Sequence, residues 1–220
     1  MTQNSLNDRT YQRIKNEIME VILKPGDTVS VQKLADRYKI SRTPVREAFV
    51  LLNQEGLLII RPQSKTEIAK LSLPRIREEK FIKKALLVAA VKDFIKSYSQ
   101  LTIDTLESMV AIMGRAIEKE KIHDFFEADK RFQRMLFHVS ENDLAIDSVI
   151  QICTHLERLR YLSITEYGFS KDTLSAYSKI IEYAKKRDIN FIQQAASELL
   201  DFDLNIDDLI KKHPNYFEIE

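Results

Sequence analysis

The sequence has little cysteine, glycine and proline and no tryptophan, and each shortage narrows the class of protein that it can encode. Because Cys153 is the single cysteine, an internal disulfide framework is excluded, and a lone thiol in an apolar helical run is expected to be a buried small side chain. Four glycines and five prolines among 220 residues, with 30% charged and 44% hydrophobic residues, are typical of a globular protein rich in helix. Disulfide-rich chains are therefore excluded, and a repetitive or disordered chain is not expected.

Long hydrophobic runs and a secretion signal are also missing. Residues 1–8 are polar, and the most apolar run, 85–91, is much shorter than the roughly 20 residues needed to span a membrane. There is no glycine-rich phosphate loop or nucleophile elbow, and the four histidines have neither metal nor catalytic spacing. We therefore expect a cytoplasmic protein with no catalytic residues, no metal, no cofactor and no membrane partner.

The net charge is only +1, but it is distributed unevenly along the chain. Residues 1–74 carry 12 Lys and Arg against 8 Asp and Glu, a net charge of +4, which leaves −3 for the rest. This asymmetry weakly favours a nucleic-acid partner for the N-terminal part.

Three helices are predicted in the first part of the chain. Apolar residues at helical spacing predict an amphipathic helix over 8–23. Ser30 is a suitable N-cap for a short second helix, and Thr43 can cap a third helix with Pro44 in its first position. Gly56 is placed to end that third helix.

The third helix has one apolar face and one face suited to DNA. Its inward stripe is predicted to be Val45, Ala48, Phe49 and Leu52, and its outward residues are predicted to be Arg42, Thr43, Arg46 and Val50. Arginine side chains near the start of a helix can reach guanine edges and phosphates in a major groove. A small helical subdomain with solvated arginines fits the same pattern, so the helix alone leaves both interpretations open.

The residues after this helix favour the DNA-binding interpretation. Short apolar runs at 57–60 and 66–69 predict a β-hairpin, and three helices followed by a hairpin make a winged helix. At the hairpin tip, Gln63, Ser64 and Lys65 can lie along the DNA backbone or in a minor groove.

The stretch 11–69 resembles the winged-helix domain of GntR-type regulators. The segments that carry the resemblance are Leu23-Lys24-Pro25-Gly26-Asp27, Leu34-Ala35, Ser41-Arg42-Thr43-Pro44-Val45-Arg46-Glu47-Ala48 and Gln54-Glu55-Gly56-Leu57. The resemblance implies that operator DNA is contacted by Gln32, Ser41, Arg42, Thr43, Arg46 and the wing-tip residues Gln63, Ser64 and Lys65. Two positions depart from the family pattern, because Gln32 replaces a residue that is often arginine and Lys65 replaces a common wing glycine.

The rest of the chain is predicted to be helical. After a linker at 71–74, helices are expected at 74–98, 103–119, 123–141, 144–166, 171–187 and 189–211. On the last of them, an inward stripe is formed by Ile192, Ala195, Leu199, Phe202, Ile206 and Leu209. The predicted fold class is mainly α, with a winged helix-turn-helix domain at 1–70 and an all-α antiparallel helical bundle at 75–220 for effector binding and dimerisation.

A few polar residues fall on inward faces of the predicted bundle. Asp129 lies in the middle of the phenylalanine-rich stripe of its helix, Gln133 shares that face, and Tyr177 lies on an apolar stripe of another helix. Such groups are costly to bury without partners, so they form either an internal hydrogen-bond network or an effector pocket. Arg158 and Tyr161 could add a cationic and aromatic wall to that pocket or lie on the surface.

The stretch 74–209 resembles, with a degraded motif, the FCD ligand-binding domain found in relatives of the fatty-acid-responsive GntR regulator. Many members have Asp-x-x-Phe-His on this helix and two later histidines, which together hold a divalent metal that helps to bind a carboxylate effector. This chain has Asp129-Lys130-Arg131-Phe132-Gln133, with Tyr177 and Leu199 where the later histidines belong. We therefore expect an effector site without metal.

The sequence as a whole predicts a homodimeric transcription regulator, with a repressor as the favoured role. Its partners would be double-stranded operator DNA and a small-molecule effector of unknown identity, for which a carboxylate is one candidate class. Two alternatives stay open. One is a ligand-independent dimeric DNA-binding protein, and the other is an enzyme that uses the bundle pocket, although no nucleophile, metal set or cofactor motif supports it.

Overall fold

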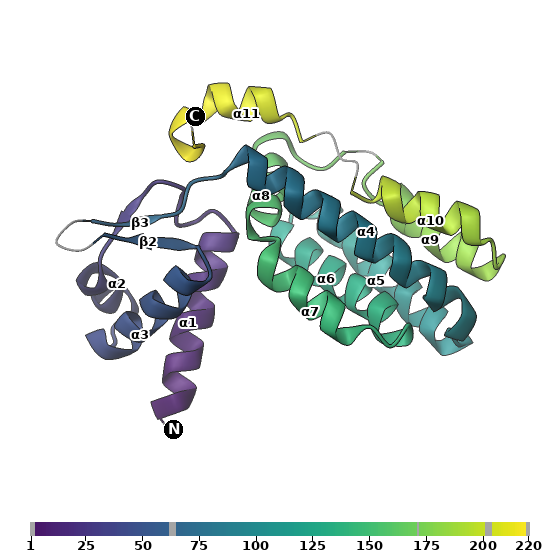
Figure 1. Ribbon diagram of the computed structural model, residues 1–220, viewed down its shortest axis with the longest axis horizontal. Coiled ribbons are helices and arrows are strands. Elements are labelled where there is room, and N and C mark those ends of the chain that lie inside the picture. Colours follow the sequence, from purple (N-terminus) through teal and green to yellow (C-terminus); the bar gives the residue numbers. More distant parts are fainter. Residues whose placement is uncertain (1–2, 62–64, 171, 201–203, 219–220) are drawn as a thin grey trace. The chain divides into compact units, whose positions relative to one another are not determined.

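The computed structural model describes residues 3–61, 65–170, 172–200 and 204–218, most of them helical (Figure 1). The chain forms two compact units that do not follow chain order. The first unit consists of Met1–Ile76, Thr154–Leu162 and Asn205–Glu220, and the second of Arg77–Cys153 and Ser163–Leu204. Residues 154–162 and 205–220, which fall inside the range that the sequence assigns to the bundle, thus belong with the winged helix.

The N-terminal part of the first unit is a winged helix. Its elements are α1 (Gln3–Met19), β1 (Thr28–Val29), α2 (Val31–Tyr38), α3 (Arg42–Gln54), β2 (Leu58–Ile60) and β3 (Thr66–Ile68). The three strands form an antiparallel sheet in the order β1-β3-β2, with Leu58 opposite Ile68. The sequence pattern does not predict the short strand β1, because two residues are too few to show an alternation.

The caps of these helices follow the sequence only in part. Ser30 caps α2 as predicted, since its hydroxyl accepts from the amide of Lys33 at 3.2 Å. The cap assigned to Thr43 is wrong, because α3 begins at Arg42 and Ser41 occupies the cap position without a side-chain hydrogen bond. Pro44 fits the first turn, where backbone amides have no partner within the helix.

The core of the winged helix is formed by the predicted inward faces. On α3 the whole predicted stripe is buried, and Ile14 and Ile18 of α1 are fully buried against it. The helix α1 ends at Met19 rather than near residue 23, since Val21 has a φ of +57° and breaks the helical path. This core holds the outer face of α3 in place.

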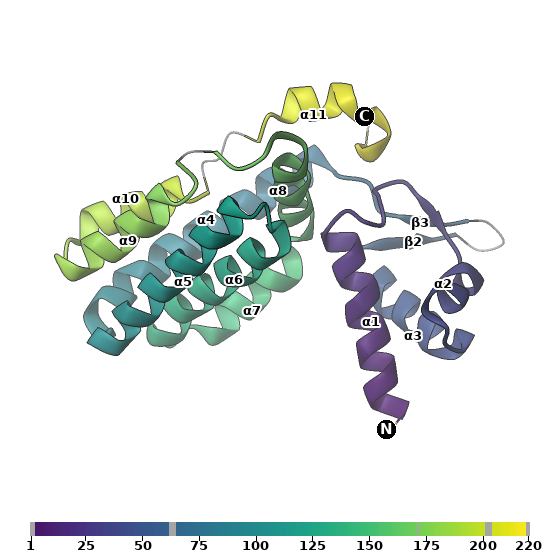
Figure 2. The same cartoon turned by 180° about the vertical axis from the view of Figure 1, so that it is seen from behind.

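The second unit is a helical bundle. Its elements are most of α4 (Leu73–Ser97), α5 (Gln100–Glu118), α6 (Ile122–Val139), α7 (Asp143–Ile152), the end of α8 (Thr154–Tyr167), α9 (Ser175–Lys185) and α10 (Ile189–Glu198). The helix α5 packs against α6 and α9, α6 packs against α7, and α9 packs against α10, while α4 runs along the same bundle in Figure 1 and Figure 2. The predicted all-α bundle is therefore present.

Two of the predicted long helices are each split in the structure. The helix expected at 144–166 divides at Cys153, whose ψ of 45° interrupts α7 and α8. The helix expected at 189–211 divides into α10 and α11 (Ile206–Lys212), and Asn205 before α11 has a left-handed φ of 46°. The predicted stripe from Ile192 to Leu209 therefore does not belong to one helix, and Phe202 in it lies outside the described residues.

The end of the chain completes the first unit. After α11, a 3-10 turn at Pro214–Tyr216 leads to Phe217, which forms a parallel bridge with Leu71. Leu71 donates its amide to the carbonyl of Tyr216 at 2.8 Å and accepts from the amide of Glu218 at 3.0 Å. Within the described part of the chain, no helix has the length and apolar character that crossing a membrane requires.

Candidate functional site

The outer face of α3 carries the side chains that the sequence assigns to DNA. Ser41, Arg42, Thr43 and Arg46 are all exposed at the beginning of the helix, while Val45 and Leu52 on the opposite face are fully buried. The two arginines are four residues apart, so they lie on one side of the helix. A helix start of this kind can present bidentate guanidinium donors to guanine edges.

Gln32 is exposed on α2, but its amide is engaged within the helix. Its Nε2 donates to both carboxylate oxygens of Asp36, at 2.6 and 2.7 Å. A contact between Gln32 and DNA would therefore have to replace these hydrogen bonds.

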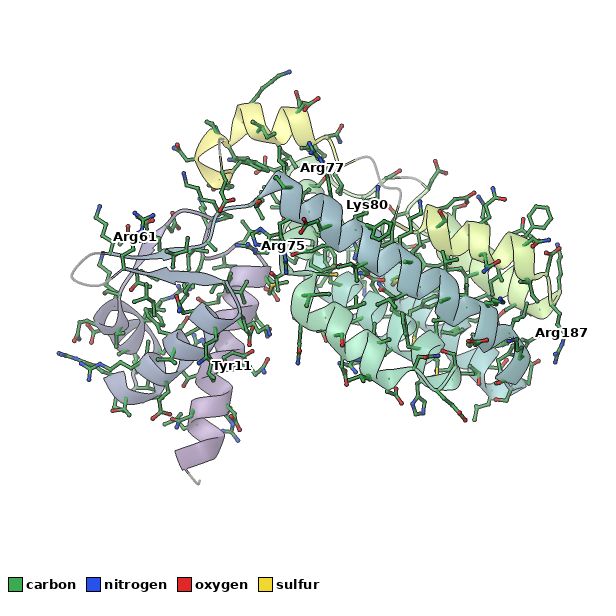
Figure 3. All side chains as sticks on the ribbon, viewed as in Figure 1. Tyr11, Arg61, Arg75, Arg77, Lys80 and Arg187 are labelled. Carbon is green, nitrogen blue, oxygen red and sulfur yellow. The ribbon has the colours of Figure 1, made fainter. Side chains whose placement is uncertain are left out.

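The wing adds positive charge at the end of the hairpin. Lys65 is exposed directly before β3, and Arg61 is exposed directly after β2, where Figure 3 labels it. Gln63 and Ser64, which the sequence assigns to the wing tip, lie outside the described residues. The sequence analysis did not assign Arg61 to DNA. Arg61 is a basic residue at the same hairpin turn as Lys65, so the same argument applies to it.

Polar contacts fix α1 against the other two helices of the winged helix. The hydroxyl of Tyr11 on α1, a residue that Figure 3 labels, donates to Glu55 after α3. Lys15 forms an ion pair with the same carboxylate at 2.7 Å. The Tyr38 hydroxyl donates to Glu17 at 2.8 Å, and burial together with this bond raises the pKa of Tyr38. The surface that the sequence assigns to DNA is thus carried by firmly packed helices.

In the second unit, the structure brings together the three polar residues that the sequence placed on inward faces. Asp129 and Gln133 of α6 and Tyr177 of α9 are 1%, 4% and 0% exposed. The Oδ1 atom of Asp129 accepts from Nε2 of Gln133 at 2.6 Å and from the hydroxyl of Tyr177 at 2.8 Å. We call these three residues the buried polar cluster.

Aromatic rings surround this cluster. Phe132 meets the ring of Tyr177 edge to face at a centroid distance of 5.2 Å, and Phe125 does so at 6.4 Å. Both geometries are favourable for aromatic pairs and hold the phenol in place. The cluster is therefore a small polar group enclosed by apolar side chains, and a carboxylate in such surroundings requires hydrogen-bond donors.

The donor chemistry of the cluster does not fit the divalent metal implied by the FCD resemblance. Gln133 and Tyr177 each donate a hydrogen bond to Asp129 instead of offering lone pairs to a cation, and they stand where the resemblance expects imidazoles. Within the described residues, no group of three or more His, Cys, Asp or Glu side chains is placed to hold a metal ion.

Arg158 and Tyr161, assigned to the effector site from the sequence, are not brought to the cluster. Both lie on the part of α8 that belongs to the first unit. Arg158 is fully buried and donates from Nη1 to the carbonyl of Ala69 at 2.6 Å. The pKa of Tyr161 is raised to about 12 by burial and by the negative charge of Glu20. The contacts described for these two residues lie in the first unit, and the effector role that the sequence gives them stays a prediction.

Sequence reasoning missed two buried charged residues of the second unit. Glu79 and Lys83, one helical turn apart on α4, are 1% and 5% exposed. Both share the inward stripe of α4 with Leu87 and Phe94, which are also buried. Both could have been predicted to be buried, because they occupy inward positions on the apolar stripe of their helix, as Asp129 does on α6.

A helix with exposed arginines beside a hairpin wing defines the class as a winged-helix DNA-binding protein. The model of the bacterial regulatory proteins of the gntR family matches residues 6–68, and the FCD domain model matches residues 82–202. The chain therefore belongs to the GntR family and carries an FCD domain after its winged helix. It is a DNA-binding transcription regulator.

A curated relative supports the same assignment, and two solved structures share the fold. The chain is 28% identical over 195 residues to the HTH-type transcriptional repressor RspR of Escherichia coli (strain K12), covering 89% of this chain and 86% of the relative. A solved structure of E. coli McbR/YncC shares the fold with a TM-score of 0.79 and 18% identity, covering 97% of this chain and all of that chain. A GntR regulator from Rhodococcus sp. RHA1 matches with a TM-score of 0.69 and 19% identity over 92% of this chain and 95% of that chain.

Proposed function

We propose that this protein is a sequence-specific repressor that binds its operator as a homodimer and releases it when an organic effector binds in the helical bundle. The observation that carries the proposal is the exposed pair Arg42 and Arg46 in the first turns of α3, which contacts β2 of the wing. The repressor role is supported by the relative RspR, which is named a repressor. In this proposal Ser41, Thr43 and Lys65 contact phosphates and position the arginines.

The homodimer predicts a two-fold symmetric operator. Two copies of α3 in successive major grooves would read half-sites about one helical turn, or roughly 10 base pairs, apart. The test is selection of bound duplexes from a random pool by the full-length protein, followed by sequencing and by light scattering of the complex. Enrichment of an inverted repeat bound by two copies supports the proposal. Enrichment of no sequence contradicts it.

The buried polar cluster is the proposed effector site. In the absence of a bridging metal, Asp129 repels a carboxylate placed against it, so a donor group of the effector should face this side chain. A carboxylate effector would then place its anionic end elsewhere in the bundle. Thermal shift with panels of amines, polyols and monocarboxylates tests this arrangement. Stabilisation by a donor-bearing compound that is lost in Asp129→Asn supports the site, and stabilisation that survives this substitution contradicts it.

A second candidate function is a DNA-binding protein that needs no effector. It is favoured by the near-complete burial of the cluster, in which Gln133 and Tyr177 already donate hydrogen bonds to Asp129. In that case the three residues only hold α6 and α9 together. Operator binding that none of the compounds changes, together with unchanged melting temperatures, would select this function over the first.

A further inference from the structure

The four residues after the wing are held by contacts from two distant parts of the chain. The carbonyl of Ala69, directly after β3, accepts from Nη1 of Arg158 on α8 at 2.6 Å. Leu71 is paired with the C-terminal segment around Phe217. The amide of Ser72 donates to Nδ1 of His155, also on α8, at 3.1 Å. We call residues 69–72 the wing exit.

We propose that Arg158 and His155 are positioning residues for the wing, so that α8 sets the wing's place in the DNA-binding unit. The inference rests on the proposed function, because it concerns how the same DNA contacts are controlled. Neither residue needs to touch DNA. Each acts through the backbone of the wing exit, which leads directly back to β3 and Lys65.

The wing is also attached to the winged helix on both strands, since the amide of Ile60 in β2 donates to Oδ1 of Asn53 on α3 at 3.2 Å and the amide of Ile68 in β3 donates to the carbonyl of Asp27 at 2.9 Å. Its strands are three residues long, and β3 is joined to the body by β1 and by the amide of Gly26, which donates to the carbonyl of Ile68 at 2.9 Å. Ala69 continues the hairpin, since its amide donates to the carbonyl of Leu57 at 3.0 Å. The Arg158 hydrogen bond therefore acts on the last paired residue of the wing.

The burial of Arg158 shows that its place is specific. The side chain is 0% exposed and also donates from Nε to the carbonyl of Thr154 at 3.3 Å. A guanidinium is expensive to bury and is kept where its planar donors meet fixed acceptors. If its only role were packing, an apolar side chain of similar volume would serve as well.

His155 provides a hydrogen-bond acceptor at the other end of the wing exit, where Arg158 provides a donor at the first. Its Nδ1 accepts a hydrogen bond, so the ring is neutral, with its proton on Nε2. Burial, followed by the charges of Arg158 and Arg75, lowers its pKa to about 3 and keeps the ring neutral near pH 7. A donor and an acceptor on one helix thus hold a carbonyl and an amide three residues apart.

The helix α8, which carries Arg158 and His155, has residues in both compact units. The helix is continuous over Thr154–Tyr167, and its residues from Ser163 onward belong to the second unit. A shift of α8 along or about its axis would move both positioning residues together.

A double-mutant cycle on the selected operator tests the proposal. Arg158→Met removes the donors and keeps an unbranched side chain, and we expect it to weaken binding by about two- to thirtyfold, the range for substitutions that act through a coupled element. In the Lys65→Ala background the same substitution should have a smaller effect, because one of the DNA contacts that depend on the wing's position is already lost. In the Arg46→Ala background it should keep its full effect, because α3 is a separate contact. Equal effects in both backgrounds would overturn the proposal.

A second pair of variants keeps the test decisive if Arg158→Met does not fold. His155→Asn places an amide oxygen near the position of Nδ1, and His155→Leu has almost the same shape without an acceptor. We expect operator affinity to be retained in the first and reduced in the second, with the reduction again smaller when Lys65 is alanine. Equal affinity in both variants contradicts the proposal. A wild-type protein that enriches no DNA would instead mean that the proposed function itself is wrong.

Discussion

At the scale of single residues, the polar side chains that matter most in this protein are the buried ones with fixed partners. Asp129 accepts from two donors within one aromatic cluster, and Arg158 donates to a backbone carbonyl that is distant in the sequence. Removing one partner of such a pair leaves the other desolvated, which costs more than the bond contributes to net stability. Residue-scale predictions therefore concern stability and its pH dependence.

Replacing Tyr177 by phenylalanine should destabilise the bundle by about 1–3 kcal/mol, because Asp129 loses a buried donor while the ring packing is preserved. Urea unfolding of the full chain, followed by circular dichroism, measures this change. Tyr183→Phe is the matched control, since this half-buried ring stacks on Phe191 and its substitution should have little effect. Equal stability of the two variants would show that the Tyr177 hydroxyl contributes nothing.

The stability of the first unit should depend on pH through His155. Its pKa is about 3 in the folded protein against 6.5 ordinarily, so between these values the unfolded chain binds a proton that the folded chain excludes. The stabilising contribution is complete above pH 6.5 and is lost progressively as the pH falls toward 3. The urea midpoint should therefore decrease with acidification more steeply in the wild type than in His155→Asn. Parallel curves for the two proteins would contradict this assignment.

At the scale of elements, a helix or strand can be predicted from the sequence where the spacing of its own apolar residues marks the face that is buried. The stripe of α3, the N-cap Ser30 and both wing strands can be predicted because each depends on neighbours in the sequence. The breaks at Cys153 and Asn205 cannot, since neither glycine nor proline marks them and packing decides them. The cap predicted at Thr43 is misplaced by two residues because proline is tolerated throughout a first turn.

The wing should behave as a phosphate-binding element. Lys65→Ala should weaken binding to all DNA sequences and lower the slope of log affinity against log salt by about one, because one counterion fewer is released. Fluorescence anisotropy with specific and random duplexes over a salt series measures both quantities. A loss confined to the specific duplex would instead assign Lys65 to base recognition.

The C-terminal segment should stabilise the winged helix, although it is distant in sequence. Phe217 is 1% exposed and pairs with Leu71, so Phe217→Ala should destabilise the first unit by about 3–5 kcal/mol. Hydrogen exchange should then accelerate at the amides of Leu71 and Glu218, which are hydrogen-bonded in this bridge. Amide protection equal to that of the wild type would mean that the segment does not support the unit.

At the scale of the whole molecule, the two compact units are not two consecutive stretches of the chain, because each is built from segments that are separated in the sequence. The winged helix, the bundle and the inward positions of Asp129, Gln133 and Tyr177 could be predicted, because periodicity places residues on faces. The place of Arg158 and Tyr161 could not be, because periodicity does not say which unit a helix face meets. Residues 154–162 and 205–220 join the first unit although they are distant from the winged helix in sequence.

Such a division suits a regulator in which two sites communicate. In the proposed function, effector binding in the bundle and operator binding at α3 influence each other equally, because coupling between two binding equilibria is reciprocal. In the proposed function, operator DNA should therefore weaken effector binding by the same factor by which effector weakens operator binding.

The measurement that tests the central claim most directly is the operator affinity of Arg46→Ala. This account predicts a loss of about 1–3 kcal/mol in specific binding with an unchanged melting temperature, because an exposed arginine that reads base edges is removed. Arg131→Ala, which removes an exposed arginine of α6 in the second unit, is the matched control and should bind as the wild type does. Unchanged operator affinity in a normally folded Arg46→Ala protein would contradict the assignment of α3 as the recognition helix.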